Sequence, residues 1–148
     1  MYQEKFYYLV HLQFLGFRFH GWQKQVGVKT VQYMLEQTLN TVIGKETFKT
    51  LGASRTDSMV SAEHHMCVVT AHNEQDPAEL MTGLNRNLPQ DLKVLKIEIV
   101  DKKFQIINSR KTKEYHYSFS YGEKTHPFCS PFLTNILDDL DLELMKEG

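Results

Sequence analysis

Residues 52–57 (Gly-Ala-Ser-Arg-Thr-Asp) contain two charged side chains whose spacing suits acid–base or nucleophilic chemistry. Side chains two residues apart in an extended segment point the same way, so Arg55 and Asp57 can face one cleft. A nearby guanidinium favours the ionised form of a carboxylate, which can then act as a nucleophile or a general base. The alternative is that Asp57 caps a turn and Arg55 is solvated. Spacing alone favours this alternative, because Asp is a common turn residue.

A second candidate is the aromatic run within residues 113–121. Alternate residues of a strand share a face, and here that face carries Tyr115, Tyr117, Phe119 and Tyr121. An aromatic face can stack a flipped nucleobase. The alternative, a stripe of core residues, suits most of the four. Tyr115 is the best exception, because it stands at the start of the run.

Cations and amides alternate with aromatic residues in the loop between residues 18 and 25. This mixture suits phosphate contacts and base stacking. The candidate RNA contacts of this loop are Arg18, His20, Trp22, Gln23 and Lys24. The alternative is a surface loop that Trp22 anchors to the core, and the two interpretations are compatible.

A short basic run leads into Tyr115. Its cations, Arg110, Lys111 and Lys113, suit contacts with phosphates. A solvated face is the usual alternative for such a run.

Residues 64–67 (His-His-Met-Cys) raise the question of a metal site. His65 and Cys67 would share one face of a strand. No second pair of ligands with the spacing of zinc sites accompanies them. We therefore expect no metal and interpret this segment as a strand with two edge histidines.

The intervening segments predict the elements that position these candidates. Alternation of apolar residues predicts strands, and apolar residues at helical spacing predict helices, one with Thr30 at its start and Gly44 at its end and one opened by Asp76-Pro77. The order predicts an α+β, ferredoxin-like βαββαβ fold, an antiparallel sheet with two helices on one face, plus an additional C-terminal strand. The expected strands are residues 6–14, 47–54, 63–72, 93–100 and 113–121, and the second helix ends near residue 87.

Composition limits the classes of protein to which the chain can belong. The chain has 148 residues, 41% hydrophobic and 24% charged, which is enough to bury the core of one ordinary domain. Apolar runs are too short to span a bilayer, no secretory signal is visible, and two cysteines make no disulfide framework. We expect a cytoplasmic protein without membrane contact. The net charge of −1 favours no particular partner.

The C-terminal segment is acidic and resembles the beginning of a helix. Residues 138–148 hold five acids and one base, which leaves 16 bases and 13 acids in the remainder. A mildly basic body is compatible with nucleic-acid binding. We expect residues 1–137 to form the ferredoxin-like unit and residues 138–148 to begin a helix that leads into a second half.

Together, the segments resemble the TruA-type tRNA pseudouridine synthase family in motif content and order. The segments that carry the resemblance are Phe19 to Gln25, Thr30-Val31-Gln32, Gly52 to Asp57, Leu84-Asn85 with Leu88-Pro89 and Asp91, and Lys113 to Tyr117.

The resemblance implies isomerisation of uridine to pseudouridine in the anticodon stem-loop of tRNA, without cofactor or metal, by an enzyme that is a homodimer at full length. It implies that Asp57 is the catalytic carboxylate, that Arg55 pairs with it and that Tyr115 belongs to the active site. If the sequence is a fragment, we expect it to fold but to turn over poorly.

Three residues of the active-site loop depart from the family pattern. Ser54 and Met59 replace glycines, and Ser61 replaces a histidine. A methionine resists a positive φ, so we expect the loop to run differently. An Ile106-Ile107 pair also stands where the family has Ala-Arg, which removes one candidate RNA contact.

Two other classes of function remain open from the sequence. One is a noncatalytic RNA-binding module derived from the same fold. An RRM-like version is disfavoured because the strand over residues 63–72 carries no aromatic residue. The other is a small-molecule enzyme or metal-binding domain, since a ferredoxin-like fold hosts many functions.

Overall fold

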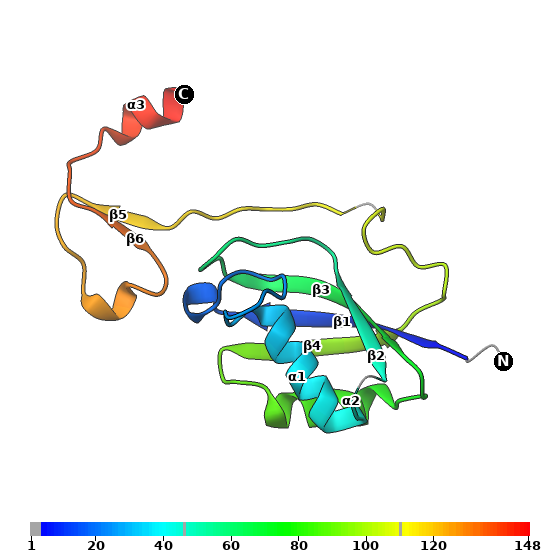
Figure 1. Cartoon of the computed structure of the whole chain (residues 1–148). Helices are drawn as coiled ribbons and strands as arrows, with labels where there is room; N and C mark the ends of the chain where they lie inside the picture. The colour runs from blue at the N-terminus through cyan, green and yellow to red at the C-terminus, as the bar shows by residue number, and fades with distance from the viewer. Residues whose placement is uncertain (1–3, 46, 110) are drawn as a thin grey trace. The chain divides into compact units, whose positions relative to one another are not determined.

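Alternating apolar residues build the strand at the centre of the fold. In the computed structural model, which describes residues 4–45, 47–109 and 111–148, β1 (Phe6–Phe14) buries Tyr8, Val10 and Leu12 on one face. It pairs antiparallel with β3 (Ala62–Ala71) on one side and β4 (Leu92–Ile99) on the other. β2 (Phe48–Gly52) pairs with β3, which gives the order β2-β3-β1-β4 (Figure 1). This order is that of the predicted ferredoxin-like sheet.

Both helices begin at the predicted caps. α1 (Val31–Ile43) follows Thr30, whose hydroxyl accepts the Tyr33 N–H at 3.3 Å. α2 (Pro77–Asn87) follows Asp76, whose carboxylate accepts the N–H groups of Ala78 and Glu79 at 3.0 and 2.9 Å. Such caps satisfy N–H groups that have no partner within the helix.

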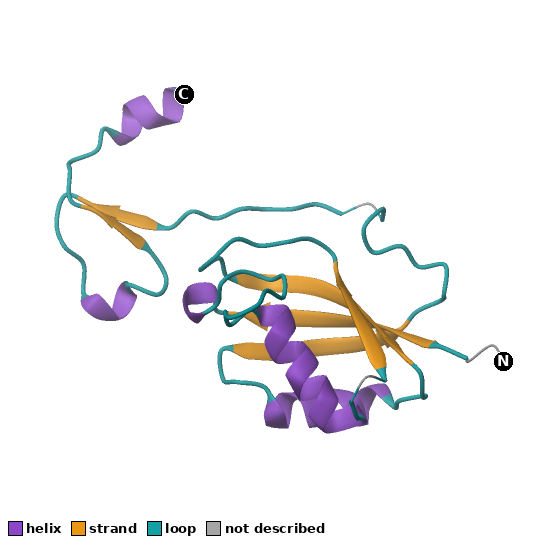
Figure 2. Ribbon diagram, viewed as in Figure 1, coloured by secondary structure: helices purple, strands orange, loops and turns teal. Residues whose placement is uncertain are grey.

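The helices cover one face of the sheet, as predicted (Figure 2). Leu35 and Leu39 of α1 and Leu84 of α2 are fully buried against the apolar residues of β1. On the opposite face a smaller apolar cluster joins Leu9, Val68 and Ile106. Every end of the four strands lies within two residues of the predicted position.

The chain divides into two compact units, residues 1–110 and 111–148. In the second unit β5 (Phe119–Tyr121) pairs parallel with β6 (Thr134–Ile136). A single 3₁₀ turn (Pro127–Cys129) lies between them, and α3 (Leu142–Glu147) follows its N-cap Asp141. The predicted domain division at residue 137 stays a prediction.

The strand predicted over residues 113–121 is wrong in its extent. Residues 111–118 have no regular secondary structure, and only Phe119–Tyr121 form a strand, β5. The reason is that alternation describes side chains, whereas a strand also needs a hydrogen-bonded neighbour. β6 supplies that neighbour for three residues only.

Within the described residues, no helix has both the length and the apolar composition needed to cross a membrane.

Candidate active site

The loop between β2 and β3, residues 53–61, carries the two predicted catalytic residues of the first unit. Arg55 and Asp57 are both exposed. Among the described residues no ion pair joins them, so their pairing stays a prediction. The loop turns at this point, because the Val60 N–H donates to the Asp57 carbonyl at 3.3 Å. The arrangement leaves the Asp57 side chain accessible to a substrate.

A second loop, which follows β1 and includes the 3₁₀ turn Gly16–Arg18, holds the Asp57 loop through backbone hydrogen bonds. The Trp22 N–H donates to the Thr56 carbonyl at 3.2 Å, and the Met59 N–H donates to the Phe19 carbonyl at 3.0 Å. The two bonds flank Asp57 in sequence. They fix the position of its backbone although its side chain is exposed.

A further hydrogen bond between the two loops involves Ser61. Its hydroxyl accepts the Gly16 N–H at 2.8 Å. Gly16 is itself pressed against the same loop, since a Cβ built on it would lie 2.0 Å from the Val60 carbonyl oxygen. Only glycine allows this approach. Ser61 therefore contributes to the backbone support of the Asp57 loop.

Trp22 anchors its loop to the core, as one of the two sequence interpretations proposed. Its side chain is 3% exposed and lies 4.3 Å from the His65 ring, centroid to centroid. It also packs on Gly52, where a Cβ would lie 2.4 Å from the indole nitrogen. Burial leaves no face of the indole free to stack a nucleobase. His20 and Gln23 of the same loop are exposed.

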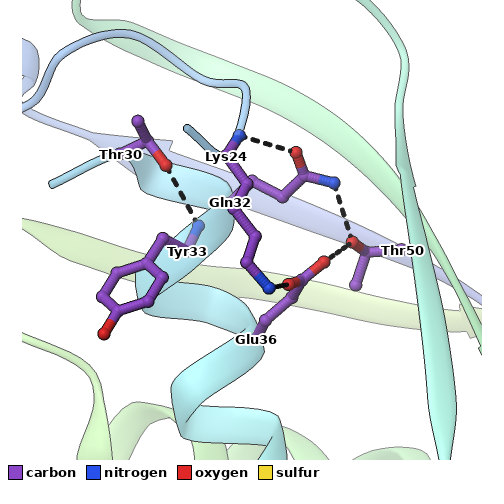
Figure 3. A network of polar contacts seen from close by, with 6 residues as sticks. All are labelled: Lys24, Thr30, Gln32, Tyr33, Glu36 and Thr50. Carbon is purple, nitrogen blue, oxygen red and sulfur yellow. Dashed lines mark hydrogen bonds and ion pairs between the residues drawn. The ribbon is translucent and has the colours of Figure 1, made fainter. Parts of the chain in front are cut away.

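Lys24 belongs to a polar network that joins this loop to α1 and β2 (Figure 3). Gln32 accepts the Lys24 backbone N–H at 3.0 Å and donates to the Thr50 hydroxyl at 2.9 Å. Glu36 accepts the Lys24 ammonium and the Thr50 hydroxyl, each at 2.7 Å. Its carboxylate raises the pKa of Lys24. The network ties the loop to the strand that leads into residues 53–61.

Arg18, the remaining candidate of this loop, pairs with a residue distant in sequence. Its guanidinium lies 2.8 Å from the carboxylate of Asp91, which is buried beside β4. The Arg18 side chain is 54% exposed, so part of the guanidinium still faces solvent.

The second unit carries the other candidates. Tyr115 is 82% exposed and lies in the irregular segment before β5. Lys111 and Lys113 are exposed in the same segment. Arg110 lies outside the described residues. The assignment of these four residues to the site stays a prediction.

The histidine segment forms a strand, as predicted, but this strand does not lie at an edge of the sheet. β3 lies between β2 and β1, so it is not an edge strand, and His65 is buried beside Trp22. His64 instead approaches His11 of β1, with 2.7 Å between their ring nitrogens. In the part of the chain that the structure describes, no group of three or more His, Cys, Asp or Glu side chains is arranged to hold a metal ion.

A comparison with protein families shows to which family the chain belongs. A family model described as tRNA pseudouridine synthase matches residues 11–107, which is more than half of the chain and includes both loops. The chain belongs to the tRNA pseudouridine synthase family.

Several curated members of this synthase family are similar to the chain over nearly its whole length. tRNA pseudouridine synthase A of Aquifex aeolicus is 30% identical over 94% of this chain and 57% of its own length. The proteins of the same name from Thermodesulfovibrio yellowstonii and Thermosipho africanus are 32% and 33% identical, over 93% and 95% of this chain and 54% and 57% of theirs. The chain thus spans a little over half the length of these relatives.

Met59 is the departure from the synthase family pattern with the clearest structural consequence. It adopts φ 66°, the left-handed conformation that glycine favours. Among the described residues it is the only non-glycine with a positive φ. The methionine therefore accepts a backbone conformation that we expected it to resist.

The contacts that two acids, Glu36 and Asp91, make with the loop after β1 were not anticipated from the sequence. Glu36 had a local signal, because it lies four residues after Gln32 and so shares its helix face. The pairing of Asp91 with Arg18 had none, since the two are separated by 73 positions along the chain.

Proposed function

We propose that this chain carries the catalytic centre of a tRNA pseudouridine synthase and that Asp57 is its catalytic carboxylate. One observation carries the proposal. Asp57 is exposed, while the residues on both sides of it are held by the backbone of the neighbouring loop, at Thr56 and Met59. An accessible side chain on a fixed backbone suits a group that must meet a substrate in one geometry.

The proposed reaction rearranges one uridine without net oxidation or reduction. The bond between N1 and C1′ breaks, the base turns, and C5 bonds to C1′. The proton on C5 is lost and N1 gains one. Asp57 would attack C1′ or remove the proton from C2′, and either role requires an ionised carboxylate. Arg55, two residues away, would hold Asp57 and fill the space that the extruded base leaves.

Tyr115 is proposed to stack on the uracil and to accept the C5 proton. Its high exposure leaves both faces of the ring accessible. The proposed phosphate contacts are Arg18, Lys24, Lys111 and Lys113, with Arg110, and His20 and Gln23 are further candidates for RNA contact.

The remaining features follow from the family rather than from contacts in this chain. We propose that the substrate is the anticodon stem-loop of tRNA, that the full-length enzyme is a homodimer and that it works in the cytoplasm. Because the chain spans little more than half of its relatives, we expect slow turnover from it alone.

The test is tritium release from tRNA labelled at C5 of uridine. We expect release from the unchanged chain and from Asp138→Asn, a control that removes an exposed carboxylate of the second unit. Asp57→Asn keeps the shape of the side chain but cannot act as a base or a nucleophile, so release should fall by about 10³-fold or more. Full activity of Asp57→Asn would exclude the assignment.

A noncatalytic RNA-binding module is the second candidate function. The observation that favours it is the unusual loop itself, with Met59 in a left-handed conformation and Ser61 in place of histidine. That candidate predicts that the chain binds tRNA but releases no tritium, even when a second half is supplied.

A further inference from the structure

A buried carboxylate immediately before β4 fixes the orientation of Arg18. The Asp91 side chain is only 5% exposed, whereas that of Arg18 is 54% exposed. The Arg18 Nε–H donates to one oxygen of Asp91, Oδ2, at 2.9 Å, and Nη2 lies 2.8 Å from the same oxygen. The other oxygen, Oδ1, is buried and has no hydrogen-bond partner among the described residues. Arg18 is thus the ion-pair partner that balances this buried charge.

This contact occupies one edge of the guanidinium and leaves the rest of it unused by Asp91. A guanidinium carries five N–H groups in a rigid plane. Asp91 faces the edge formed by Nε and Nη2, so the outer edge, which Nη1 and Nη2 form, lies outside this contact. Such a fork fits two oxygens of a phosphate group. Because Asp91 already orders the side chain, binding a phosphate costs less conformational entropy.

Arg18 lies in the part of the second loop that supports the Asp57 loop. Arg18 is flanked by Gly16, which donates to Ser61, and by Phe19, which accepts from Met59. Asp91 also holds this segment through its backbone, since its carbonyl accepts the Leu15 N–H at 3.0 Å. Side chain and backbone of one residue therefore position the segment that contacts the Asp57 loop.

We propose that Asp91 is a positioning residue that presents Arg18 to a phosphate group of the RNA bound at the Asp57 loop. This inference rests on the proposed function, because it requires that RNA binds there.

The direction in which Asp91→Asn changes RNA affinity distinguishes positioning by Asp91 from a simple effect of its charge. Asp91→Asn removes a negative charge, so electrostatics alone predicts tighter binding of a polyanion. Positioning predicts the opposite, since an amide holds the guanidinium less firmly and the phosphate contact weakens. Arg18→Lys is the complementary change, because it keeps the charge and removes the fork.

The experiment measures the dissociation constant of an unmodified tRNA transcript at several salt concentrations. We expect Arg18→Gln, Arg18→Lys and Asp91→Asn each to weaken binding about fivefold. Arg18→Gln and Asp91→Asn should also lower the salt slope by about one, because each loses the phosphate contact. The double variant Arg18→Gln/Asp91→Asn should bind no more weakly than Arg18→Gln. Glu63→Gln, which removes an exposed carboxylate from β3, should bind as tightly as the unchanged chain or more tightly.

Each outcome supports or overturns the proposal that Asp91 positions Arg18. Unchanged or tighter binding by Asp91→Asn, or additive losses in the double variant, would overturn the inference and leave the proposed function standing. If Asp91→Asn fails to fold by circular dichroism, Arg18→Lys decides, and its binding like the unchanged chain would equally overturn the inference. Failure of the unchanged chain to bind the transcript would overturn both the proposed function and this inference.

Discussion

Gly21 lies against the Thr56 carbonyl so closely that a Cβ on it would come within 2.4 Å of that oxygen. Its own φ is +79°, and the next residue, Trp22, donates its N–H to the same carbonyl. The two loops therefore meet at their backbones, one position before Asp57. Gly21 satisfies two demands at once, a left-handed conformation and the absence of a side chain.

Gly21→Ala should be far more harmful than Gly27→Ala. Gly27 has nearly the same φ, +80°, but a Cβ there meets nothing within 4 Å. We expect Gly27→Ala to cost about 1 kcal/mol of stability, from the backbone conformation alone, and Gly21→Ala about 3 kcal/mol, because the Thr56 carbonyl must also move. Urea denaturation measures both. Equal losses would show that the contact with Thr56 is unimportant.

Met59→Gly should be more stable than Met59→Ala. Both remove a side chain that is 56% exposed, so little packing is lost in either. Alanine retains the cost of φ 66°, whereas glycine does not. The difference should be about 1 kcal/mol in the free energy of unfolding, reduced somewhat by the greater freedom of glycine in the unfolded chain. An alanine variant as stable as the glycine variant would contradict this account.

Cys67 should resist alkylation in the folded protein. It is fully buried in β3, and burial raises the pKa of its thiol to about 12. Since the thiolate is the reactive form, iodoacetamide at pH 8 should label the partly exposed Cys129 and leave Cys67 unlabelled until denaturant is added. Peptide mass spectrometry identifies the labelled site. Rapid labelling of Cys67 in folded Cys129→Ser would refute the prediction.

Glu98 should contribute to stability at neutral pH and lose that contribution in acid. Its carboxylate accepts hydrogen bonds from Lys96 and from His11, and these lower its pKa below the ordinary value of 4.5. A carboxylate with a lowered folded-state pKa stabilises the fold above its unfolded-state pKa, and the effect disappears as the pH falls through the folded-state value.

The matching measurement is the urea midpoint of Glu98→Gln against pH. Above pH 5 we expect the urea midpoint of Glu98→Gln to be slightly lower than that of the unchanged chain. The two midpoints should converge as the pH falls below 4.5. The control Glu63→Gln, an exposed acid of β3, should show no such convergence. A pH-independent offset for Glu98→Gln would mean that side-chain packing, not charge, is responsible.

Local sequence signals predict the helices and strands of the first unit. Thr30 and Asp76 mark the helix starts because their side chains cap N–H groups only a few residues away. The alternation in β1 predicts its bounds, Phe6–Phe14, because one face of the strand packs against the helices. These signals are local, so a single sequence contains them. The motif at residues 52–57 also located the candidate site, although the roles of Arg55, Asp57 and Tyr115 stay predictions.

The remote segments that support that site are visible only in the folded chain. The pairing of Arg18 with Asp91 and the approach of Gly16 to Val60 join residues that no periodicity relates. The same limit explains the overlong strand at residues 113–121, where alternation was present but a pairing neighbour reached only Phe119–Tyr121. The physical reason is that periodicity records which side of an element is buried, whereas hydrogen bonds and close backbone contacts depend on what the folded chain brings alongside it.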